Sequence, residues 1–325
     1  MHLRGLAYAF AASFMFGLGA VLAKFLSGVF DTTIIAIIAL TAGGLLLAGV
    51  AALTRAPLVA ALGGLNRRAW LDLLLLACPG TAIPLLVIVA GFAQTSALEG
   101  GLLLQLNGMA ALLFAVLLLG ERIRWKQSLG VLLLLLGGAL VVVAGANGGS
   151  GGSNLGNLLI LIGSVGVGFG YIPAKKLVAR IDPLSLSAWR LLVGAVTIAP
   201  ITAFQLLTAA RGLLWQPTPT NLAILGLYTA TNFSLAYVAQ QGGLRLLEAW
   251  QVAAIGQTVP LFSTLFAILL LHERLTLLQG AGGLLAILGG IVVSLNNATP
   301  TRTPLPVAAA PAPEAAETPQ APFAG

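Results

Sequence analysis

The side chains best suited to bind a solute are two glutamines that stand inside long apolar segments of the chain. Gln105 and Gln257 occupy corresponding positions, because the surrounding sequence recurs at an offset of 152 residues (257 minus 105). An amide both donates and accepts hydrogen bonds, so such a pair suits the carboxylate or the ammonium group of a zwitterion. The competing interpretation is a plain hydrogen bond between helices, worth roughly 1 kcal/mol or less.

Five further side chains extend this prediction. Asn107 and Asn232 are amides within apolar segments, Tyr171 and Trp250 offer rings for stacking, and Arg190 offers a positive charge for a carboxylate. Arg190 stands about 10 Å inside the end of its predicted helix, so snorkelling to the interface competes with binding. An interfacial anchor competes at Trp250. The predicted substrate-binding set is Gln105, Gln257, Asn107, Asn232, Tyr171, Trp250 and Arg190.

The sequence contains no residue pattern typical of an enzyme or a metal site. His2 and His272 stand at a terminus and in a loop, and no HExxH, GxSxG or glycine-rich phosphate loop occurs. We therefore expect no catalytic residue, no metal and no cofactor. The segment 3–26 contains no acid, and Glu99 and Glu248 stand at predicted helix ends. The sequence alone therefore does not support coupling to protons.

The composition places these side chains in a membrane protein. The chain of 325 residues is 58% hydrophobic and 8% charged, with a mean hydropathy of +1.01. A soluble domain of this kind would expose too much apolar surface, whereas about 20 apolar residues span a bilayer as a helix. Ten such spans are predicted, at 3–26, 32–54, 69–92, 101–119, 126–146, 154–175, 183–207, 221–241, 249–271 and 276–295.

The Lys and Arg residues predict the orientation of these spans. Most of the 16 basic residues fall in the N-terminus, in alternate loops and in the tail, all on one side of the predicted membrane. Loops on the other side contain only Arg211 and Arg274. Because cationic loops stay in the cytoplasm, both termini are predicted to be cytoplasmic, in the cell (inner) membrane. The positive charge indicates topology and contact with anionic lipid, and no nucleic-acid partner is expected.

The two halves of the chain resemble each other. Residues 113–141 recur at 265–293, and the matches include Phe114/Phe266, Glu121/Glu273, Gln127/Gln279 and Gly137/Gly289. A weaker upstream match at an offset of 151 pairs Asp31 with Asp182, and both are expected to cap helices. Glu121 and Glu273 are expected to organise their turns with the neighbouring arginines. Each half holds five predicted spans, an odd number, so the second copy is predicted to be inverted.

These repeated residues resemble the signature of the EamA family of the drug/metabolite transporter (DMT) superfamily. The first copy reads Gly120-Glu121-Arg122, Gln127, Gly130 and Gly137-Gly138, and the second reads Pro260-Leu261-Phe262, Glu273-Arg274 and Gly289-Gly290. The resemblance implies an all-α integral membrane protein with ten helices in two inverted five-helix repeats, similar to exporters of amino acids, other metabolites or drugs. Gly108 stands where the second copy has Pro260, and Ala39 is the counterpart of Arg190, so the substrate does not follow from the resemblance.

The predicted organisation is a first repeat at 1–146, a Gly/Ser linker at 147–153, a second repeat at 154–296 and a disordered, Ala/Pro-rich cytoplasmic tail at 297–325. The predicted function is secondary transport of a small neutral or zwitterionic metabolite or drug, by export through alternating access. Transport of anionic or phosphorylated metabolites, an ion channel, and a non-transporting membrane scaffold or sensor are the alternatives. The expected partners are a small-molecule substrate and the lipid bilayer, and a homodimer is left open.

Overall fold

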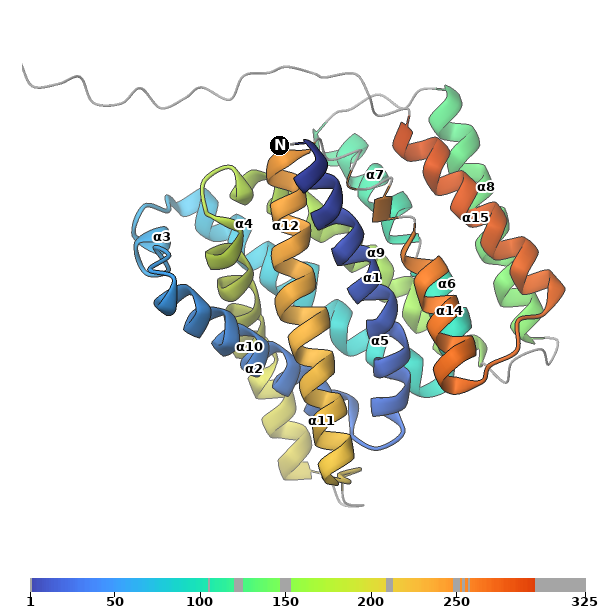
Figure 1. Ribbon diagram of the computed structural model, residues 1–325, viewed down its shortest axis with the longest axis horizontal. Coiled ribbons are helices and arrows are strands. Elements are labelled where there is room, and N and C mark those ends of the chain that lie inside the picture. Colours follow the sequence, from blue (N-terminus) through green and yellow to red (C-terminus); the bar gives the residue numbers. More distant parts are fainter. Residues whose placement is uncertain are drawn as a thin grey trace, which may run out of the picture.

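The computed structural model describes residues 2–104, 106–119, 125–146, 153–208, 213–247, 252, 255–256 and 258–295. Within these ranges the chain forms a bundle of long helices that run side by side (Figure 1). The strand-type pairing in the same ranges is confined to an isolated bridge between Phe30 and Trp215. The all-α prediction is therefore confirmed for the described residues. The predicted tail lies outside them, as does the predicted linker except Ser153.

The helices of the first half are α1 (His2–Ser27), α2 (Thr32–Leu53), α3 (Ala60–Gly63), α4 (Arg67–Ala77), η1 (Cys78–Ala82), α5 (Ile83–Gln94), α6 (Ala97–Leu103), α7 (Leu106–Leu119) and α8 (Trp125–Ala146). Those of the second half are α9 (Asn154–Val178), α10 (Pro183–Thr208), α11 (Pro219–Tyr228), η2 (Thr229–Leu235), α12 (Ala236–Leu246), α14 (Val259–Leu271) and α15 (Leu277–Leu295). The two η elements are π-helical turns inside longer helices.

Several helical segments are long and apolar enough to cross a bilayer. In the described ranges these are Leu3–Ser27, Thr32–Leu53, Arg67–Gln94, Asn154–Val178, Pro183–Thr208 and Pro219–Leu246. Shorter apolar helices occur at Ser128–Leu140, Val259–Leu271 and Leu277–Gly289. All of them overlap predicted spans, which supports an integral membrane protein, while the total of ten spans and their inverted repeat stay predictions.

The predicted fourth span, 101–119, is divided into α6 and α7. The helix begins earlier than predicted, at Ala97, because the Ser96 hydroxyl accepts a hydrogen bond from the Glu99 N–H at 3.0 Å and caps the first turn. α6 ends at Leu103 and α7 begins at Leu106. The prediction placed this boundary one turn too late, because hydropathy does not register a polar N-cap.

Helices of the first half pack mainly on helices of the second half. α1 packs on α12 and α14, α2 packs on α10, and α9 packs on α5 and α7. The two halves therefore interlock around a shared apolar core. Its largest fully buried side chains are Leu26, Phe30, Ile35, Leu40, Leu73, Leu76, Phe92, Leu98, Leu103, Ile160 and Leu177.

The α8–α15 pair lies at one side of the bundle (Figure 1). A Cβ atom built on Gly137 of α8 would stand 2.5 Å from the Ala286 nitrogen and 2.5 Å from the Gly282 carbonyl oxygen of α15. Only glycine allows two helix backbones to approach so closely, and close approach maximises van der Waals packing inside a membrane.

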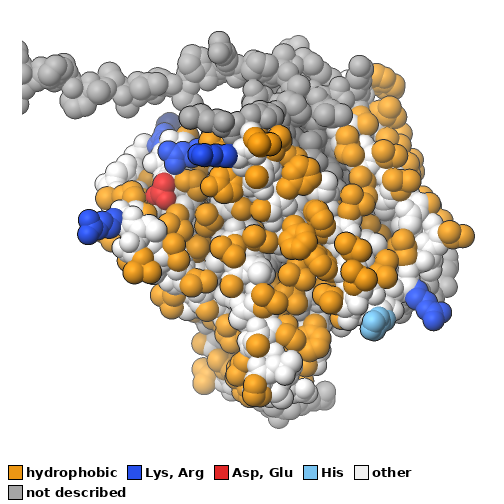
Figure 2. Space-filling view, viewed as in Figure 1, with side chains coloured by type: hydrophobic (Ala, Val, Ile, Leu, Met, Phe, Trp, Pro, Cys, Tyr) orange, Lys and Arg blue, Asp and Glu red, His pale blue; other side chains and the backbone are white. Residues whose placement is uncertain are grey.

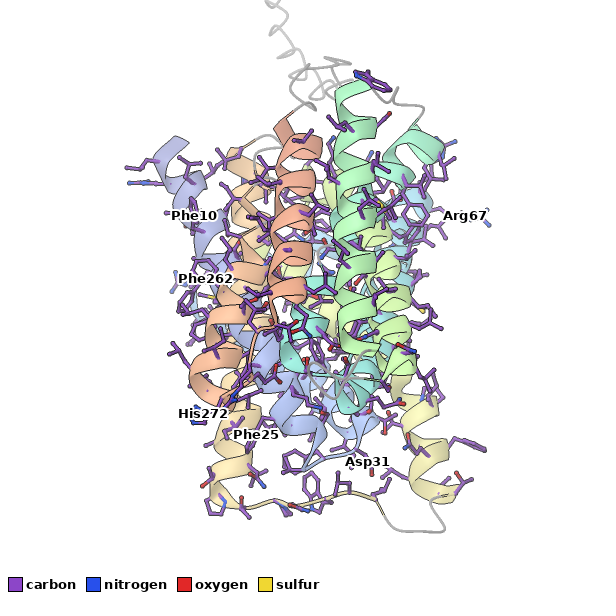
Figure 3. All side chains as sticks on the ribbon, turned by 90° about the vertical axis from the view of Figure 1, so that its right-hand side faces the viewer. Phe10, Phe25, Asp31, Arg67, Phe262 and His272 are labelled. Carbon is purple, nitrogen blue, oxygen red and sulfur yellow. The ribbon has the colours of Figure 1, made fainter. Side chains whose placement is uncertain are left out.

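The bundle has two distinct ends, named here after residues labelled in Figure 3. The Asp31 end carries Phe25, Asp31 and His272, and the Arg67 end lies opposite (Figure 3). The Arg67 end also carries the salt bridge from Lys176 to Asp72 at 3.6 Å. In Figure 2 Lys and Arg side chains lie mainly at the upper left, another lies at the lower right beside the histidine, and a broad apolar surface lies between them.

Candidate substrate site

Arg190 lies inside the bundle, on α10, with 4% of its surface exposed. Its Nε donates a hydrogen bond to Thr81 Oγ1 at 2.6 Å, and its Nη2 donates to the Gly80 carbonyl at 3.3 Å. The side chain therefore points across the bundle to η1. The snorkelling alternative is not what the structure shows, because the guanidinium hydrogen-bonds in the interior.

The turn η1 can receive Arg190 because a proline disturbs helix hydrogen bonding there. In an α-helix the Gly80 carbonyl would accept from residue 84, but Pro84 has no N–H. The Gly80 carbonyl therefore has capacity for the guanidinium. The Thr81 hydroxyl donates to the Leu76 carbonyl at 2.7 Å, which leaves its lone pairs free to accept from Arg190.

The charge of Arg190 is met by neutral groups. Its guanidinium carbon stands 4.0 Å from the centre of the Tyr237 ring on α12, a cation–π contact. Within the described part of the chain the salt bridge is that of Lys176 with Asp72, and no carboxylate there pairs with Arg190. A buried cation without a counterion is costly. The geometry therefore offers a place where an anionic group would be stabilised.

Two more polar side chains stand beside this cation. Gln240 Nε2 on α12 donates to the Tyr171 hydroxyl on α9 at 3.0 Å. Tyr237 and Gln240 are three residues apart on α12, so they share one face of that helix. α9, α10 and α12 thus direct a cation, two phenols and an amide toward one region, called here the Arg190 cluster.

Aromatic rings continue from the Arg190 cluster into the apolar core. The centre of the Tyr237 ring lies 5.6 Å from the centre of the Phe16 ring on α1 and 5.9 Å from that of the Phe233 ring in η2, and both pairs meet edge to face. Phe233 in turn contacts Tyr228 at 5.3 Å. Rings in this arrangement provide an apolar, polarisable wall next to the cation.

Gln241 is fully buried, and within the described residues neither its Oε1 nor its Nε2 has a hydrogen-bond partner. It follows Tyr237 by four residues on α12, so both side chains lie on one helix face. Leaving a buried amide unpaired costs about 1–3 kcal/mol. Such a cost is typical of a group that a ligand or a second conformation satisfies.

Asn232 shows a second unpaired polar atom, in η2. Its Oδ1 is buried and has no hydrogen-bond partner in the part of the chain that the structure describes, and a Cβ atom on Gly19 of α1 would stand almost on top of it. Asn232 is the counterpart of Thr81 at the offset of 151, and Arg190 is the counterpart of Ala39. The hydrogen bond that Thr81 receives from Arg190 therefore has no equivalent at Asn232, because alanine has no donor.

The other predicted residues are placed as follows. Gln105, Gln257 and Trp250 lie outside the described residues. Asn107 lies on α7, with its backbone carbonyl 2.5 Å from where a Cβ of Gly168 on α9 would stand, one turn before Tyr171. The structure thus brings Arg190 and Tyr171 to the same face of α12, through Tyr237 and Gln240. Asn107 and Asn232 are not brought together: α7 packs mainly on α9, whereas η2 packs mainly on α2, α1 and α12.

Sequence reasoning missed Thr81, Tyr237, Gln240 and Gln241. Pro79 and Pro84 around Thr81 are a signal that a π-helical turn with free acceptors forms there. Gln240 and Gln241 were not selected because the predicted span ended at residue 241, which placed them at a helix end. In the structure α12 continues to Leu246, so both glutamines lie inside a helix.

The comparison with protein families now identifies the chain. The family model of the EamA-like transporter family matches residues 3–143 and 154–295. The chain belongs to the EamA-like transporter family. It is therefore an integral membrane transporter, and the predicted family membership is confirmed.

Two curated relatives and one solved structure are similar to this EamA-like transporter. An uncharacterized transporter of Methanothermobacter thermautotrophicus is 24% identical over 235 residues, covering 72% of this chain and 67% of the relative. A probable amino-acid metabolite efflux pump of Escherichia coli is 29% identical over 200 residues, covering 58% of this chain and 64% of the relative. The chain thus spans about two thirds of the relatives' length. A crystal structure at 18% identity has a TM-score of 0.65 and covers 91% of this chain and 98% of its own, so the fold is shared.

Proposed function

We propose that this EamA-like transporter exports a small solute that carries a carboxylate, of the neutral or zwitterionic, amino-acid-like class. The observation that carries the proposal is Arg190, a buried guanidinium held by Thr81, Gly80 and the Tyr237 ring, with no acid paired to it in the described ranges. A substrate carboxylate would supply the missing negative charge. Arginine suits this role because its planar donors match a carboxylate bidentately.

The surrounding side chains fit the rest of such a solute. Phe16 and Tyr237 would cover an apolar or aromatic portion, and the Gln240 and Gln241 amides would bond its polar atoms. The unpaired Oδ1 of Asn232 would accept from an ammonium group once α1 moves away from it. These roles presuppose alternating access, in which the interlocked halves rock around the bundle interior.

The name of one relative supports this substrate class and direction. One of the curated relatives is named as a probable amino-acid metabolite efflux pump. Phosphorylated or multiply anionic cargo would require several interior cations, and in the described part of the bundle the Arg190 cluster provides one. We therefore rank anionic and phosphorylated metabolites below carboxylate-bearing zwitterions.

Counterflow in liposomes tests the proposed function. Purified protein is reconstituted, loaded with one unlabelled solute at a time and offered its labelled form, with amino acids, sugar phosphates and amines as three panels. We expect saturable exchange for members of the amino-acid panel and a large loss in Arg190→Gln. Exchange confined to sugar phosphates or to amines, or an unaffected Arg190→Gln variant, would contradict the proposal.

We also propose that the Arg67 end is cytoplasmic, in the cell (inner) membrane, and that residues 1–146 and 154–296 are inverted repeats. Cationic residues at the start of α4 and the end of α9 support this orientation. Topology reporters fused at Gly151 and at the C-terminus should report opposite sides of the membrane. Reports from the same side would exclude five spans in each half.

A further inference from the structure

A narrow pocket of about 160 Å³ lies between α14 and α15 (Figure 1). The two helices follow each other in the chain, but α14 packs on α1 and α6 whereas α15 packs on α8. The Leu261 and Leu284 side chains of the lining are each more than half exposed, so the pocket opens onto the apolar surface as a groove. We call it the α14–α15 groove, and its lining includes Leu102, Leu261, Thr264, Leu275, Gly280 and Leu284.

Helix α6 forms the floor of the α14–α15 groove. A Cβ atom built on Gly101 of α6 would collide with the Ser263 side chain of α14. A Cβ atom built on Gly283 of α15 would stand 2.8 Å from Leu102 Cδ2 of α6. Because Gly101 and Leu102 are consecutive residues, α6 contacts both helices and lies between them.

The amide that borders the groove already has hydrogen-bond partners. Gln279 Oε1 accepts from the Thr276 N–H at 3.1 Å and from the Thr276 hydroxyl at 3.0 Å. Gln279 Nε2 donates at 3.1 Å to Oε1 of Glu99, an acid of α6 with no exposed surface. The groove therefore suits an apolar guest, and an apolar cavity of about 150 Å³ is large enough to bind benzene.

The length of the groove matches the depth of one leaflet of a bilayer. Its lining follows the chain from Leu275, before the first turn of α15, to Ile287. Between Leu277 and Ile287 the helix rises about 15 Å. The hydrocarbon core of a bilayer is about 30 Å thick, so one acyl tail extends over about 15 Å of it. A tail in the groove would therefore reach from the Asp31 end to the middle of the membrane.

Glu273, in the segment between α14 and α15, is bound by α6. Its carboxylate accepts from the Ala97 and Leu98 N–H groups at 2.9 and 2.8 Å. This contact corrects the expectation that Glu273 would organise its own turn with a neighbouring arginine. Glu121, for which the same was expected, lies outside the described residues.

Arg274 places a positive charge at the Asp31 end of the groove. It is exposed, it precedes Leu275 of the lining, and within the described residues no acid forms a salt bridge with it. His272 lies at the same end (Figure 3). Loops on this side of the predicted membrane contain only Arg211 and Arg274, so the orientation of the protein does not require this arginine. A cation beside an apolar groove matches a ligand with an anionic head and an apolar tail.

We propose that the α14–α15 groove binds an anionic phospholipid in the leaflet at the Asp31 end. One acyl tail lies between the two helices against Leu102, and the phosphate contacts Arg274. The planar donors of arginine suit phosphate oxygens, and cations beside membrane helices attract anionic headgroups. The site is separate from the Arg190 cluster, and lipid binding there does not depend on which solute is transported.

Photo-crosslinking locates the lipid without any transport measurement. Purified protein in phosphatidylcholine vesicles receives a trace of phosphatidylglycerol that carries a photoreactive group midway along one tail. Peptide mass spectrometry should find the adducts concentrated on α14 and α15. Unlabelled phosphatidylglycerol should compete, whereas soluble glycerol 3-phosphate, which has the phosphate but no tails, should not. Adducts spread evenly over the apolar surface, or competition by glycerol 3-phosphate, would overturn the proposal.

Two charge variants test the headgroup contact. Arg274→Gln should lower the adduct yield about fivefold, the factor expected from one cation near an anionic headgroup. Arg180→Gln, at an exposed position of the Arg67 end, is the matched control and should keep the wild-type yield. Equal yields in the two variants would rule out the contact between Arg274 and the phosphate.

Filling the groove tests the tail site. Gly280→Leu adds a side chain whose Cβ would stand 3.4 Å from Leu275 Cδ2, an ordinary contact, and it should abolish the adducts. Thr264→Phe fills the groove from α14 and gives the same test if Gly280→Leu does not fold. Gly49→Leu, where nothing lies within 4 Å of an added Cβ, should leave the adducts unchanged. Adducts that persist in the filled variants would contradict the proposal. So would a dimer, seen by light scattering, that Gly280→Leu dissociates, because the occupant would then be a second copy.

Discussion

The bundle holds two buried ionisable residues that are held in different ways. Arg190 is held by a hydroxyl, a carbonyl and an aromatic ring, and no described carboxylate pairs with it. Glu99 is held by two amides and a hydroxyl, so both of its carboxyl oxygens accept hydrogen bonds from neighbouring side chains. The Asn157 amide lies on α9 and the Gln279 amide on α15, so Glu99 joins α6 to two helices of the second half. Arg190 is therefore suited to bind an anion, whereas Glu99 is suited to hold helices together.

The largest expected effect is at Arg190. Replacing Arg190 with Gln removes charge-assisted hydrogen bonds worth about 1.5–3 kcal/mol, so the half-saturation concentration for a carboxylate substrate should rise roughly 10- to 100-fold. Arg190→Lys keeps the charge but loses the planar donors, and it should fall in between. Arg180→Gln, at an exposed position, is the control and should leave transport unchanged. Equal affinity for the substrate in Arg190→Gln and Arg180→Gln would show that Arg190 does not bind the substrate carboxylate.

The second effect concerns Asn232, the counterpart of Thr81. A Cβ added in Gly19→Ala would collide with the Asn232 side chain. The atoms met are the terminal amide of Asn232, which must turn away, so the overpacking should cost about 1 kcal/mol and thermal unfolding in detergent should occur a few degrees lower. Gly49→Ala on α2 is the matched control, because nothing lies within 4 Å of its added Cβ. That change should be neutral or stabilise by about 0.5–1 kcal/mol. Equal melting temperatures for both variants would show that Gly19 is not under steric constraint.

The third effect concerns the hydrogen bonds around Glu99. Thr95→Val removes the hydroxyl, which contacts both Glu99 and Asn157. Losing these buried hydrogen bonds should cost about 1–3 kcal/mol, so thermal unfolding in detergent should occur at a lower temperature. Thr54→Val, which changes an exposed threonine at the end of α2, should leave the melting temperature nearly unchanged. Equal melting temperatures for the two variants would show that the Thr95 hydroxyl does not stabilise this part of the bundle.

The smallest effect is expected at Gln241. Replacing this unpaired, buried amide in Gln241→Leu removes an unsatisfied group from the resting structure and should raise stability by about 1 kcal/mol. If the amide bonds substrate during transport, the same variant should bind substrate more weakly. Scanning calorimetry and counterflow on one preparation measure both. A variant that is more stable and transports normally would remove Gln241 from the Arg190 cluster.

The sequence by itself determined the class of the protein and most of its helices. Membrane helices follow from local hydropathy, so the predicted starts at Thr32, Asn154 and Pro183 coincide with those of α2, α9 and α10. The cap at Asp182 is equally local: its Oδ1 accepts from the Leu184 and Ser185 N–H groups at 3.1 and 3.0 Å. Such interactions close within one turn, which is why neighbouring residues suffice to predict them.

The tertiary structure decided whatever depends on a partner far along the chain. Asp31 was predicted to cap α2 like its counterpart Asp182, but its Oδ2 accepts instead from the N–H of Leu214, so it joins two loops at the Asp31 end. The contacts of Arg190 with η1 and the burial of Glu99 beneath α9 and α15 arise in the same way. Composition and periodicity describe one helix face at a time. Which helix face meets which, and therefore which charge is left unpaired and which carboxyl is buried among amides, is fixed only when the two halves of the chain pack together.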